Sequence, residues 1–304
     1  MSRPPANRAG HWPSAATSVV GVMGDPVTQS LSPLLHNTAF ADLGLDWVSV
    51  GFPVGAGQAP AALAGVRALG IAGLSVTMPH KSAVAGLVDE LTPTAARLGA
   101  VNCVAREKGL LVGDNTDGQG LVASLRRGAG FDPAGRRCLV AGAGGAARAV
   151  VAALADAGAS EVVVVNRTAH RAAEAASLAG GVGRVGDPAE AATADLVVNA
   201  TPVGMAGAAT ERARPLVDPG LLSAGQLAVD LVYHPLRTAW LAAAAARGAA
   251  TMGGLGMLVH QAASQLARWT GREAPVEAMW RAALAAVGRG GDVGGRPPGE
   301  APGT

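Results

Sequence analysis

Short runs rich in Val, Ile and Leu alternate with longer segments rich in Ala and Leu over most of this chain, from residue 18 to residue 287. The runs SVVGVMG (18–24), IAGLSVT (71–77) and EVVVVNRT (161–168) are typical of strands, and the longer segments between such runs are typical of helices. Regular alternation of this kind restricts the chain to an α/β architecture with largely parallel strands.

The order of these segments predicts two α/β domains, as the length of 304 residues also suggests. The first covers residues 18–117 and is completed by C-terminal helices within 255–287. The second, residues 118–254, has the strand-helix order of a doubly wound, Rossmann-type nucleotide-binding domain, and we expect an active-site cleft between the two. The remaining segments, 1–17 and 288–304, lack apolar periodicity, and we expect them to be disordered.

Composition excludes several classes of function. A formal net charge of +2 without a basic block provides no surface for nucleic acid. No stretch approaches the roughly 20 apolar residues of a transmembrane helix, and the N-terminal segment lacks the apolar region of a signal peptide. Cys103 and Cys138 are too few for a disulfide framework or a zinc site, so we expect no metal, and free thiols suit the cytoplasm. Monomer and homodimer both remain open.

A glycine-rich turn joins a predicted strand to a predicted helix in CLVAGAGGAAR (138–148). Gly142 permits the tight turn, and Gly144 permits close approach of the backbone to a pyrophosphate. Ala146 or Ala147 permits close helix packing, and the helix N-terminus offers N–H groups to the anion. Because glycine is common here and the match is GxGGAA rather than GxGxxG, the turn alone favours dinucleotide binding no more than an ordinary glycine-rich turn.

The following strand decides which cofactor is favoured. In an NAD site it ends in Asp or Glu, which accepts hydrogen bonds from the ribose hydroxyls. Here it ends in Asn166, Arg167 and Thr168, and Arg171 follows one helical turn later. Two guanidinium groups can bind a 2′-phosphate, although either alone could be an ordinary surface arginine. The pattern therefore favours NADP over NAD.

Polar side chains gather at predicted strand ends and loops of the first domain. Ser32 fits a helix N-cap, whereas Ser30 and Ser32, two residues apart in extended backbone, would point the same way and could bind one carboxylate. Thr77 ends a strand, and Asn102 lies within a predicted strand, where Asn is disfavoured unless its amide has a partner. Asp117 lies in GDNTDG, where a turn or a helix N-cap is the favoured explanation for this residue taken alone.

Lysine is rare in this chain, since only Lys81 and Lys108 occur among 24 basic residues. Lys81 follows VTMPH at the carboxyl end of a predicted strand, where open α/β sheets bind ligands. A hydride that reaches a ketone leaves an alkoxide, which an ammonium can protonate if partial burial lowers its pKa. Arginine stays charged and cannot do this. A hydroxy acid or keto acid that reacts with a nicotinamide fits this set of residues. An adjacent Asp117 would raise the pKa of Lys81 again, so we expect its role to be positional as much as electrostatic.

A set of short motifs runs from about residue 19 to residue 287: Ser-x-Ser-Pro, V-T-x-P-x-K, A-V-N, G-D-N-T-D-G, G-A-G-G-A-x-R, N-R-T-x-x-R, N-A-T-P-x-G-M and L-G-M-L-x-x-Q. Together these motifs resemble the shikimate dehydrogenase family, NADP-dependent oxidoreductases of aromatic amino-acid biosynthesis. The resemblance implies reversible, NADPH-dependent reduction of 3-dehydroshikimate to shikimate. It assigns substrate binding to the first domain and NADP to the second.

The resemblance also implies roles for individual residues. Lys81 and Asp117 are the catalytic pair. The residues implied to contact substrate are Ser30 and Ser32 at the carboxylate, Thr77, Asn102, Asp117 and Gln261 at the ring hydroxyls, and Tyr233 near the carboxylate. The residues implied to contact the cofactor are Gly142, Ala143, Gly144, Gly145, Ala146, Asn166, Arg167, Thr168, Arg171, Leu231 and Gly254.

Some residues would be interpreted differently without the resemblance. Gln261, between apolar positions of GLGMLVHQAASQL, would be expected on a solvated helix face. His36 and His260 are candidate acid/base groups by residue type, but a lone histidine beside an apolar helix face is more often structural, and we assign neither to the site.

Two positions depart from the family pattern: Ser75 stands where Asn is usual, and Gly253 stands where an acid is usual. Neither removes a predicted catalytic group, but both keep open a quinate/shikimate or aminoshikimate dehydrogenase. The paired serines and paired arginines argue against quinate and NAD. A non-catalytic NADP-binding regulator is the distant alternative, which the presence of Lys81 and Asp117 disfavours.

Overall fold

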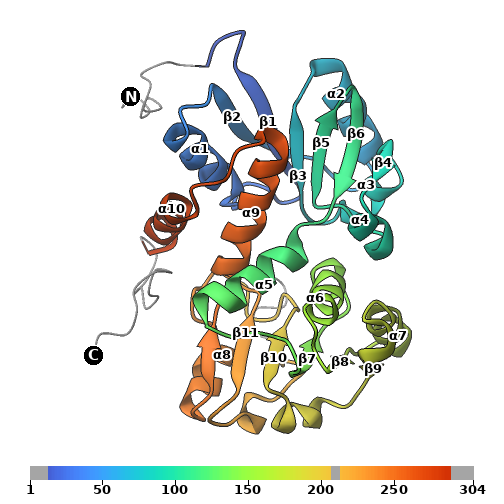
Figure 1. Ribbon diagram of the computed structural model, residues 1–304, viewed down its shortest axis with the longest axis vertical. Coiled ribbons are helices and arrows are strands. Elements are labelled where there is room, and N and C mark those ends of the chain that lie inside the picture. The colour runs from blue at the N-terminus through green and yellow to red at the C-terminus, as the bar shows by residue number, and fades with distance from the viewer. Residues whose placement is uncertain (1–12, 207–212, 289–304) are drawn as a thin grey trace. The chain divides into compact units, whose positions relative to one another are not determined.

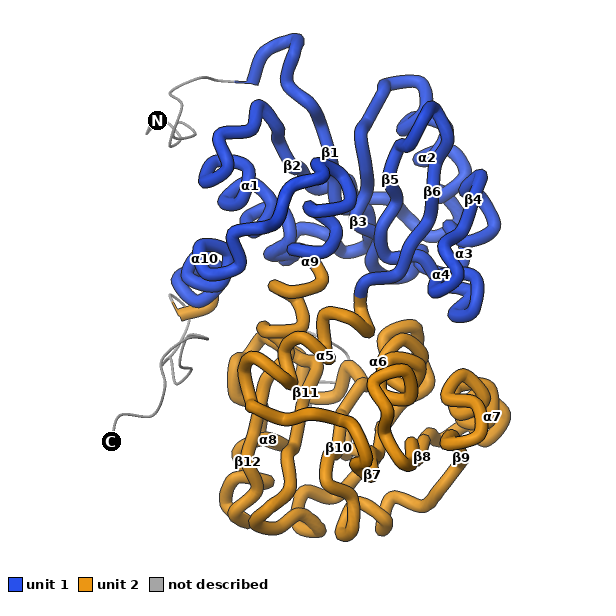
Figure 2. The backbone as a smooth tube through the Cα atoms, viewed as in Figure 1, with its two compact units in different colours: residues 1–116, 262–286 blue, residues 117–261, 287–304 orange. Residues whose placement is uncertain are grey.

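The computed structural model of the chain describes residues 13–206 and 213–288 (Figure 1). These residues form two compact units, which Figure 2 colours separately. Unit 1 comprises the residues up to 116 together with 262–286, and unit 2 comprises 117–261 together with the residues from 287 onward. The terminal segments expected to be disordered lie mostly outside the described residues. No helix among the described residues is long and apolar enough to span a membrane.

Unit 1 contains a six-stranded mixed sheet in the order β2-β1-β3-β5-β6-β4. The strands are β1 (Ser18–Gly24), β2 (Trp47–Pro53), β3 (Gly73–Val76), β4 (Glu90–Leu91), β5 (Cys103–Glu107) and β6 (Leu110–Asp114). Strand β1 pairs in parallel with β2 and β3, whereas β5 is antiparallel to both β3 and β6. The reversal occurs at a two-residue turn, where Lys108 and Gly109 have φ of 50° and 87°, as a type I′ hairpin requires.

The helices of unit 1 are α1 (Ser32–Asp42), α2 (Ala59–Leu69), α3 (Lys81–Ala85) and α4 (Pro93–Leu98), joined by the C-terminal part of α9 (Leu255–Thr270) and most of α10 (Val276–Gly288). Helix α9 is fixed to the sheet by Trp269, whose Nε1 donates to Val104 O at 3.0 Å. A Cβ on Gly73 would lie 2.3 Å from that nitrogen, so glycine is needed there. The C-terminal segment is therefore part of the unit 1 core.

Unit 2 contains a fully parallel six-stranded sheet in the order β12-β11-β10-β7-β8-β9. The strands are β7 (Arg137–Ala141), β8 (Glu161–Val165), β9 (Gly183–Val185), β10 (Leu196–Asn199), β11 (Leu227–Asp230) and β12 (Ala250–Met252). Counted along the unit, this is the order 3-2-1-4-5-6 of a Rossmann fold, with the switch point between β7 and β10.

Helices cover both faces of the unit 2 sheet (Figure 1). The α-helices are α5 (Asp117–Gly128), α6 (Gly145–Asp156), α7 (Ala169–Ser177) and α8 (Ala239–Ala246), together with the N-terminal part of α9. Successive strand residues face opposite layers: Val140 packs with residues of α5, α6 and α7, whereas Leu139 packs with residues of α8. Because both faces are buried, the strands are continuous apolar runs rather than alternating ones.

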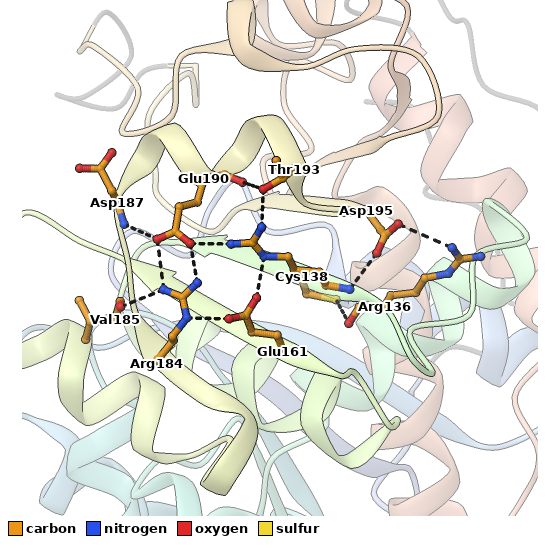
Figure 3. A network of polar contacts seen from close by, with 10 residues as sticks. Arg136, Cys138, Glu161, Arg184, Val185, Asp187, Glu190, Thr193 and Asp195 are labelled. Carbon is orange, nitrogen blue, oxygen red and sulfur yellow. Dashed lines mark hydrogen bonds and ion pairs between the residues drawn. The ribbon is translucent and has the colours of Figure 1, made fainter.

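A network of ion pairs ties together the amino ends of β7 and β8 and the neighbouring strand β9 (Figure 3). Arg137 and Arg184 both contact Glu161, each through Nε at 2.6 Å, and both contact Glu190 at 2.5 Å. Hydrogen bonds from Arg184, together with the Asp187 backbone, lower the pKa of Glu190 to about 2. Ligands of parallel sheets bind at the carboxyl ends of strands, so this network is structural.

Candidate active site

The glycine-rich turn lies between β7 and α6, at the carboxyl edge of the unit 2 sheet. Gly142 has φ of 122°, a value that side chains rarely allow, and a Cβ there would lie 3.0 Å from Ala200 O. Gly144 is the N-cap residue of α6, its Cβ position is open to 4 Å, and no side chain caps the helix. Within the part of the chain that the structure describes, the first N–H groups of α6, from Gly145 on, therefore have no side-chain acceptor, as phosphate binding requires.

The alanines of the turn differ in burial, and this separates the residue that packs the helix from those that stay accessible. Ala147 is fully buried among the residues of the unit 2 core, so it is the position of close helix packing. Ala143 and Ala146 are only half-buried. Of the two alternatives for the packing position, the structure selects Ala147 and leaves Ala146 accessible beside the turn.

The two arginines expected to select the cofactor follow β8, Arg167 in the bend after the strand and Arg171 in the first turn of α7. Asn166 Nδ2 donates to Thr168 O at 3.1 Å and forms the bend that leads into α7, of which Thr168 is the N-cap residue. Arg167 and Arg171 are exposed, and neither makes an ion pair or hydrogen bond with another described residue. Guanidinium groups without a partner among the described residues, close to the glycine-rich turn that begins α6, fit a dinucleotide that carries a 2′-phosphate in addition to its pyrophosphate.

Asp230, at the end of β11, is a buried carboxylate that the sequence analysis missed, although it interrupts the apolar run QLAVDLVY. It is 0 % exposed and accepts hydrogen bonds from Asn199 Nδ2 at 3.1 Å, Val232 N–H at 3.1 Å and Thr238 Oγ1 at 2.7 Å. Burial raises its pKa to about 6, while these hydrogen bonds act in the opposite direction.

Leu231 and Gly254, both expected at the cofactor, lie against one another. Gly254 N–H donates to Val232 O at 3.1 Å, and a Cβ on Gly254 would lie 2.0 Å from Leu231 O, so only glycine fits. Tyr233, two residues beyond Leu231, is half-buried, and burial raises the pKa of its phenol. Gly253 stands where the family usually has an acid. A Cβ there would lie 2.9 Å from Leu236 O, so the backbone at this position leaves little room for a side chain.

In unit 1 the expectation for Ser30 and Ser32 was wrong in its backbone details. Helix α1 begins at Ser32 itself, and the N-cap residue is Leu31, in a helical rather than extended conformation (φ −80°, ψ −9°). Proline is tolerated in the first helical turn because its missing N–H has no acceptor there, which allows the helix to start before Pro33. The serines still interact, since Ser32 N–H donates to Ser30 Oγ at 3.3 Å.

Thr77 and Lys81 follow β3, at the carboxyl edge of the unit 1 sheet. Thr77 N–H donates to Met23 O at 2.9 Å, and Lys81 opens α3 as a half-buried side chain. The backbone around Lys81 is fixed on both sides. Val101 N–H donates to Lys81 O at 2.8 Å, and the buried His80 ring contacts Val54 O through Nε2 at 2.6 Å.

Asn102 lies just before β5, so its predicted place within a strand was wrong, because strand pairing begins at Cys103. The expected partner for its amide is present. Asn102 Oδ1 accepts from Thr116 N–H at 2.8 Å, and Asn102 Nδ2 donates to Thr116 Oγ1 at 3.1 Å. Gln265 Nε2 of α9 donates to Asn102 O at 3.0 Å. These contacts fix a 1 % exposed side chain at the end of the sheet.

Asp117 and Gln261 belong to unit 2, whereas Ser30, Ser32, Thr77, Lys81 and Asn102 belong to unit 1. Asp117 is buried and opens α5 directly after Thr116. Gln261 is also buried, so its interpretation as a solvated residue was wrong. The cause is the close approach of α5 to α9, where a Cβ on Gly120 would lie 2.8 Å from Gln261 N.

Of the two histidines left out of the site on sequence grounds, His36 is a buried structural residue. Its Nδ1 lies 3.0 Å from Ser49 Oγ, and its ring packs edge-on against Trp269 at 4.9 Å between centroids. Burial lowers its pKa to about 3, so the ring stays neutral at physiological pH. His260 is buried too, and burial lowers its pKa.

Comparison with known proteins gives matches over most of the chain. Three family models match: "Shikimate dehydrogenase substrate binding domain" over residues 22–104, "Shikimate / quinate 5-dehydrogenase" over 127–210 and "Shikimate 5'-dehydrogenase C-terminal domain" over 254–284. The chain is 47 % identical over 294 residues to "Shikimate dehydrogenase (NADP(+))" of Moorella thermoacetica, which covers 93 % of this chain and 98 % of that protein.

Two solved structures are similar along almost their whole length. Shikimate 5-dehydrogenase from Thermus thermophilus, in complex with NADP(H) and shikimate, has a TM-score of 0.82 and 37 % identity and covers 89 % of this chain and 100 % of that one. Quinate dehydrogenase from Corynebacterium glutamicum, in complex with NAD, has a TM-score of 0.80 and 30 % identity, with coverage of 88 % and 99 %. The chain belongs to the shikimate dehydrogenase family.

Proposed function

We propose that this protein is a shikimate dehydrogenase, an oxidoreductase that reversibly reduces 3-dehydroshikimate to shikimate with NADPH in aromatic amino-acid biosynthesis. The observation that carries the proposal is the 47 % identity, over 93 % of this chain, to a relative named for both shikimate and NADP(+). The chain also has both kinds of group that such a reaction needs, a half-buried lysine at one sheet edge and an uncapped, glycine-rich helix start at another.

Unit 2 provides the groups suited to NADP. The turn formed by Gly142, Ala143, Gly144, Gly145 and Ala146 would receive the pyrophosphate at the start of α6. Asn166 and Thr168 shape the end of β8, where Arg167 and Arg171 would bind the 2′-phosphate. Leu231 and Gly254 would border the nicotinamide. When bound, the cofactor supplies or accepts the hydride.

The substrate would be held by groups that match its two kinds of oxygen. Ser30 and Ser32, linked by a hydrogen bond, can donate their hydroxyl protons to the carboxylate, with Tyr233 nearby. Thr77, Asn102, Asp117 and Gln261 provide both donors and acceptors for the ring hydroxyls.

The proton would move through Lys81. Its ammonium donates a proton to the carbonyl oxygen as that oxygen gains negative charge during reduction, and the amine recovers the proton from the shikimate hydroxyl during oxidation. Asp117 would position this ammonium through its negative charge.

The wider assignments rest on the same proposal. We assign substrate binding to residues 18–117 with 255–287 and cofactor binding to 118–254, close to the division into the two units. A cytoplasmic location is supported by Cys103 and Cys138, both of which are free and buried. The partners are the small-molecule substrate and cofactor.

Steady-state kinetics with purified protein test the proposal. Shikimate and quinate are each offered with NADP+ and with NAD+, and kcat/KM is compared over the four pairs. We expect shikimate with NADP+ to give the highest value, because β8 is followed by Arg167 rather than an acid, and Arg171 lies in the first turn of α7. A preference for quinate or NAD+ would assign the chain to the quinate branch of the family. Turnover with none of the pairs would support a non-catalytic NADP-binding protein.

A further inference from the structure

Asp230 is a fully buried carboxylate whose hydrogen-bond partners among the described residues are all uncharged. Burial of an ionised carboxylate without a cation costs free energy, and uncharged donors recover only part of it. Val229, one position earlier in the same strand, is equally buried and carries no such cost, because its side chain is apolar. The carboxylate is therefore explained by its hydrogen bonds, which fix two loops.

The first loop, residues 199–206, follows β10. An ionised carboxylate can only accept, so Asn199 must turn its Nδ2 toward Asp230. This orientation leaves Asn199 Oδ1 to accept from the Thr201 hydroxyl at 2.6 Å and from Thr201 N–H at 3.2 Å. Thr201 Oγ1 in turn accepts from Val203 N–H at 3.3 Å. The carboxylate thus fixes which way the Asn199 amide faces and, through it, the start of the loop.

The second loop, residues 230–238, follows β11. Asp230 accepts from Val232 N–H near its start and from the Thr238 hydroxyl at its end. Thr238 Oγ1 already accepts from Leu241 N–H at 3.2 Å as the cap of α8, and its proton is donated to Asp230. One carboxylate therefore closes the loop at both ends and fixes it to the following helix.

The two loops are also joined through their backbones. Leu231 N–H donates to Asn199 O at 3.0 Å, and Ala206 N–H donates to His234 O at 3.0 Å. Asp230 lies where the second loop begins, and it accepts hydrogen bonds from Asn199 of the first loop and from Val232 and Thr238 of the second. Leu231 and Tyr233, which we assign to the cofactor and substrate, stand on the second loop.

We propose that Asp230 is a positioning residue that holds the loops 199–206 and 230–238 in the single arrangement in which Leu231 can border the nicotinamide. The role of Leu231 rests on the function proposed above, whereas the fixing of the loops by Asp230 does not. Asp230 touches neither substrate nor cofactor in this proposal, and it acts through Asn199, Val232 and Thr238.

The test uses the full-length protein and two substitutions with a matched rescue. Asp230→Asn keeps the shape but replaces one accepting oxygen by a donor, and Thr238→Val removes the hydroxyl that Asp230 binds. Thr238→Ser restores that hydroxyl. Asp218→Asn is the control, because Asp218 is an exposed carboxylate of the same unit that caps a short helix through Gly220 N–H.

Two measurements are made on each variant. Hydrogen exchange of the ligand-free protein, read on peptides that cover the two loops, reports whether they are held. Calorimetric titration with NADP+ reports whether that arrangement supports binding. We expect Asp230→Asn and Thr238→Val to exchange faster in both loops but not in β7, and to bind NADP+ about tenfold more weakly, the effect of one lost hydrogen bond to a charged group. Thr238→Ser and Asp218→Asn should resemble wild type in both.

The proposal is overturned if Asp230→Asn and Thr238→Val exchange and bind as wild type does. It is also overturned if Thr238→Ser loses as much as Thr238→Val, because the hydroxyl contact would then be irrelevant. If Asp230→Asn does not fold, as judged by circular dichroism, the two threonine variants decide the question. If wild type fails to bind NADP+, the proposed function fails, and hydrogen exchange in the ligand-free protein still decides whether Asp230 holds the loops.

Discussion

Thr116 and Asn102 exchange hydrogen bonds in both directions: Thr116 N–H donates to Asn102 Oδ1 at 2.8 Å, and Asn102 Nδ2 donates to Thr116 Oγ1 at 3.1 Å. This pairing decides the orientation of the Asn102 amide, whose oxygen faces the Thr116 backbone. Because Asp117 is the next residue along the chain, the same pair fixes the backbone that leads into α5. Thr116 therefore supports a proposed substrate contact on one side and a proposed catalytic residue on the other.

Thr116→Val should weaken substrate binding selectively, because valine keeps the shape but removes the oxygen that accepts from Asn102 Nδ2. We expect KM for shikimate to rise about tenfold, with KM for NADP+ unchanged. Thr116→Ser keeps the oxygen and should behave as wild type. Equal changes in both KM values would argue that the substitution disturbs the fold in general.

Lys81→Ala should lower kcat about 10²–10⁴-fold with little change in KM, as loss of a general acid/base does. Lys81→Arg should not restore the rate, because a guanidinium does not release its proton. The other lysine provides the control: Lys108 is exposed in the β5–β6 turn, and Lys108→Arg should leave kcat unchanged. A Lys81→Arg variant with near wild-type kcat would show that the charge binds substrate and moves no proton.

Arg167→Ala and Arg171→Ala should each lower kcat/KM for NADP+ about tenfold and leave the value for NAD+ almost unchanged, because only NADP+ carries the 2′-phosphate. The effect should weaken at high salt, since both side chains are exposed. The control is Arg136→Ala, because Arg136 is also exposed but lies at the amino end of β7, away from the glycine-rich turn. Parallel losses for both cofactors would place the two guanidinium groups elsewhere on the nucleotide.

The raised pKa of Asp230 predicts how stability depends on pH. Between pH 3.8, the ordinary pKa of Asp, and about 6, its value here, the folded state binds more protons at this group than the unfolded state does. The free energy of unfolding should therefore fall as pH rises through this window, by up to about 3 kcal/mol for a shift of two units. Urea unfolding of wild type and Asp230→Asn at pH 4.5 and pH 7 measures this contribution. Identical pH dependence in the two proteins would contradict it.

The ion-pair network around Glu190 should matter for stability and not for catalysis. Glu190→Gln removes the charge that Arg137 and Arg184 share and should lower the free energy of unfolding by about 1 kcal/mol, less at high salt. Turnover should not change, since the network lies at the amino ends of β7 and β8. Urea unfolding at two salt concentrations, paired with kinetics, checks both expectations.

The sequence by itself determined the α/β class and the glycine-rich turn between a strand and a helix, and it singled out Lys81 as the candidate acid/base. Each depends on local preferences: β-branched runs favour strands, Gly142 permits a φ that other residues avoid, and the scarcity of lysine singles out Lys81. The strands β4, β9 and β12 were missed because two or three residues are too few to show a periodic pattern. The start of α1 was misplaced by one residue because proline fits more than one position of a first helical turn.

Only the tertiary structure decided which polar residues are buried and what they bind. Gln265 meets Asn102 across 163 residues of chain, and Gln261 is buried because Gly120, far away in sequence, lets two helices approach. In the sequence Asp230 is a single charged residue in an apolar run, and only the packed sheet brings Asn199 of the neighbouring strand close enough to donate to it. Side-chain hydrogen bonds are set by groups that meet only after strands and helices have packed, so local sequence patterns carry no record of them.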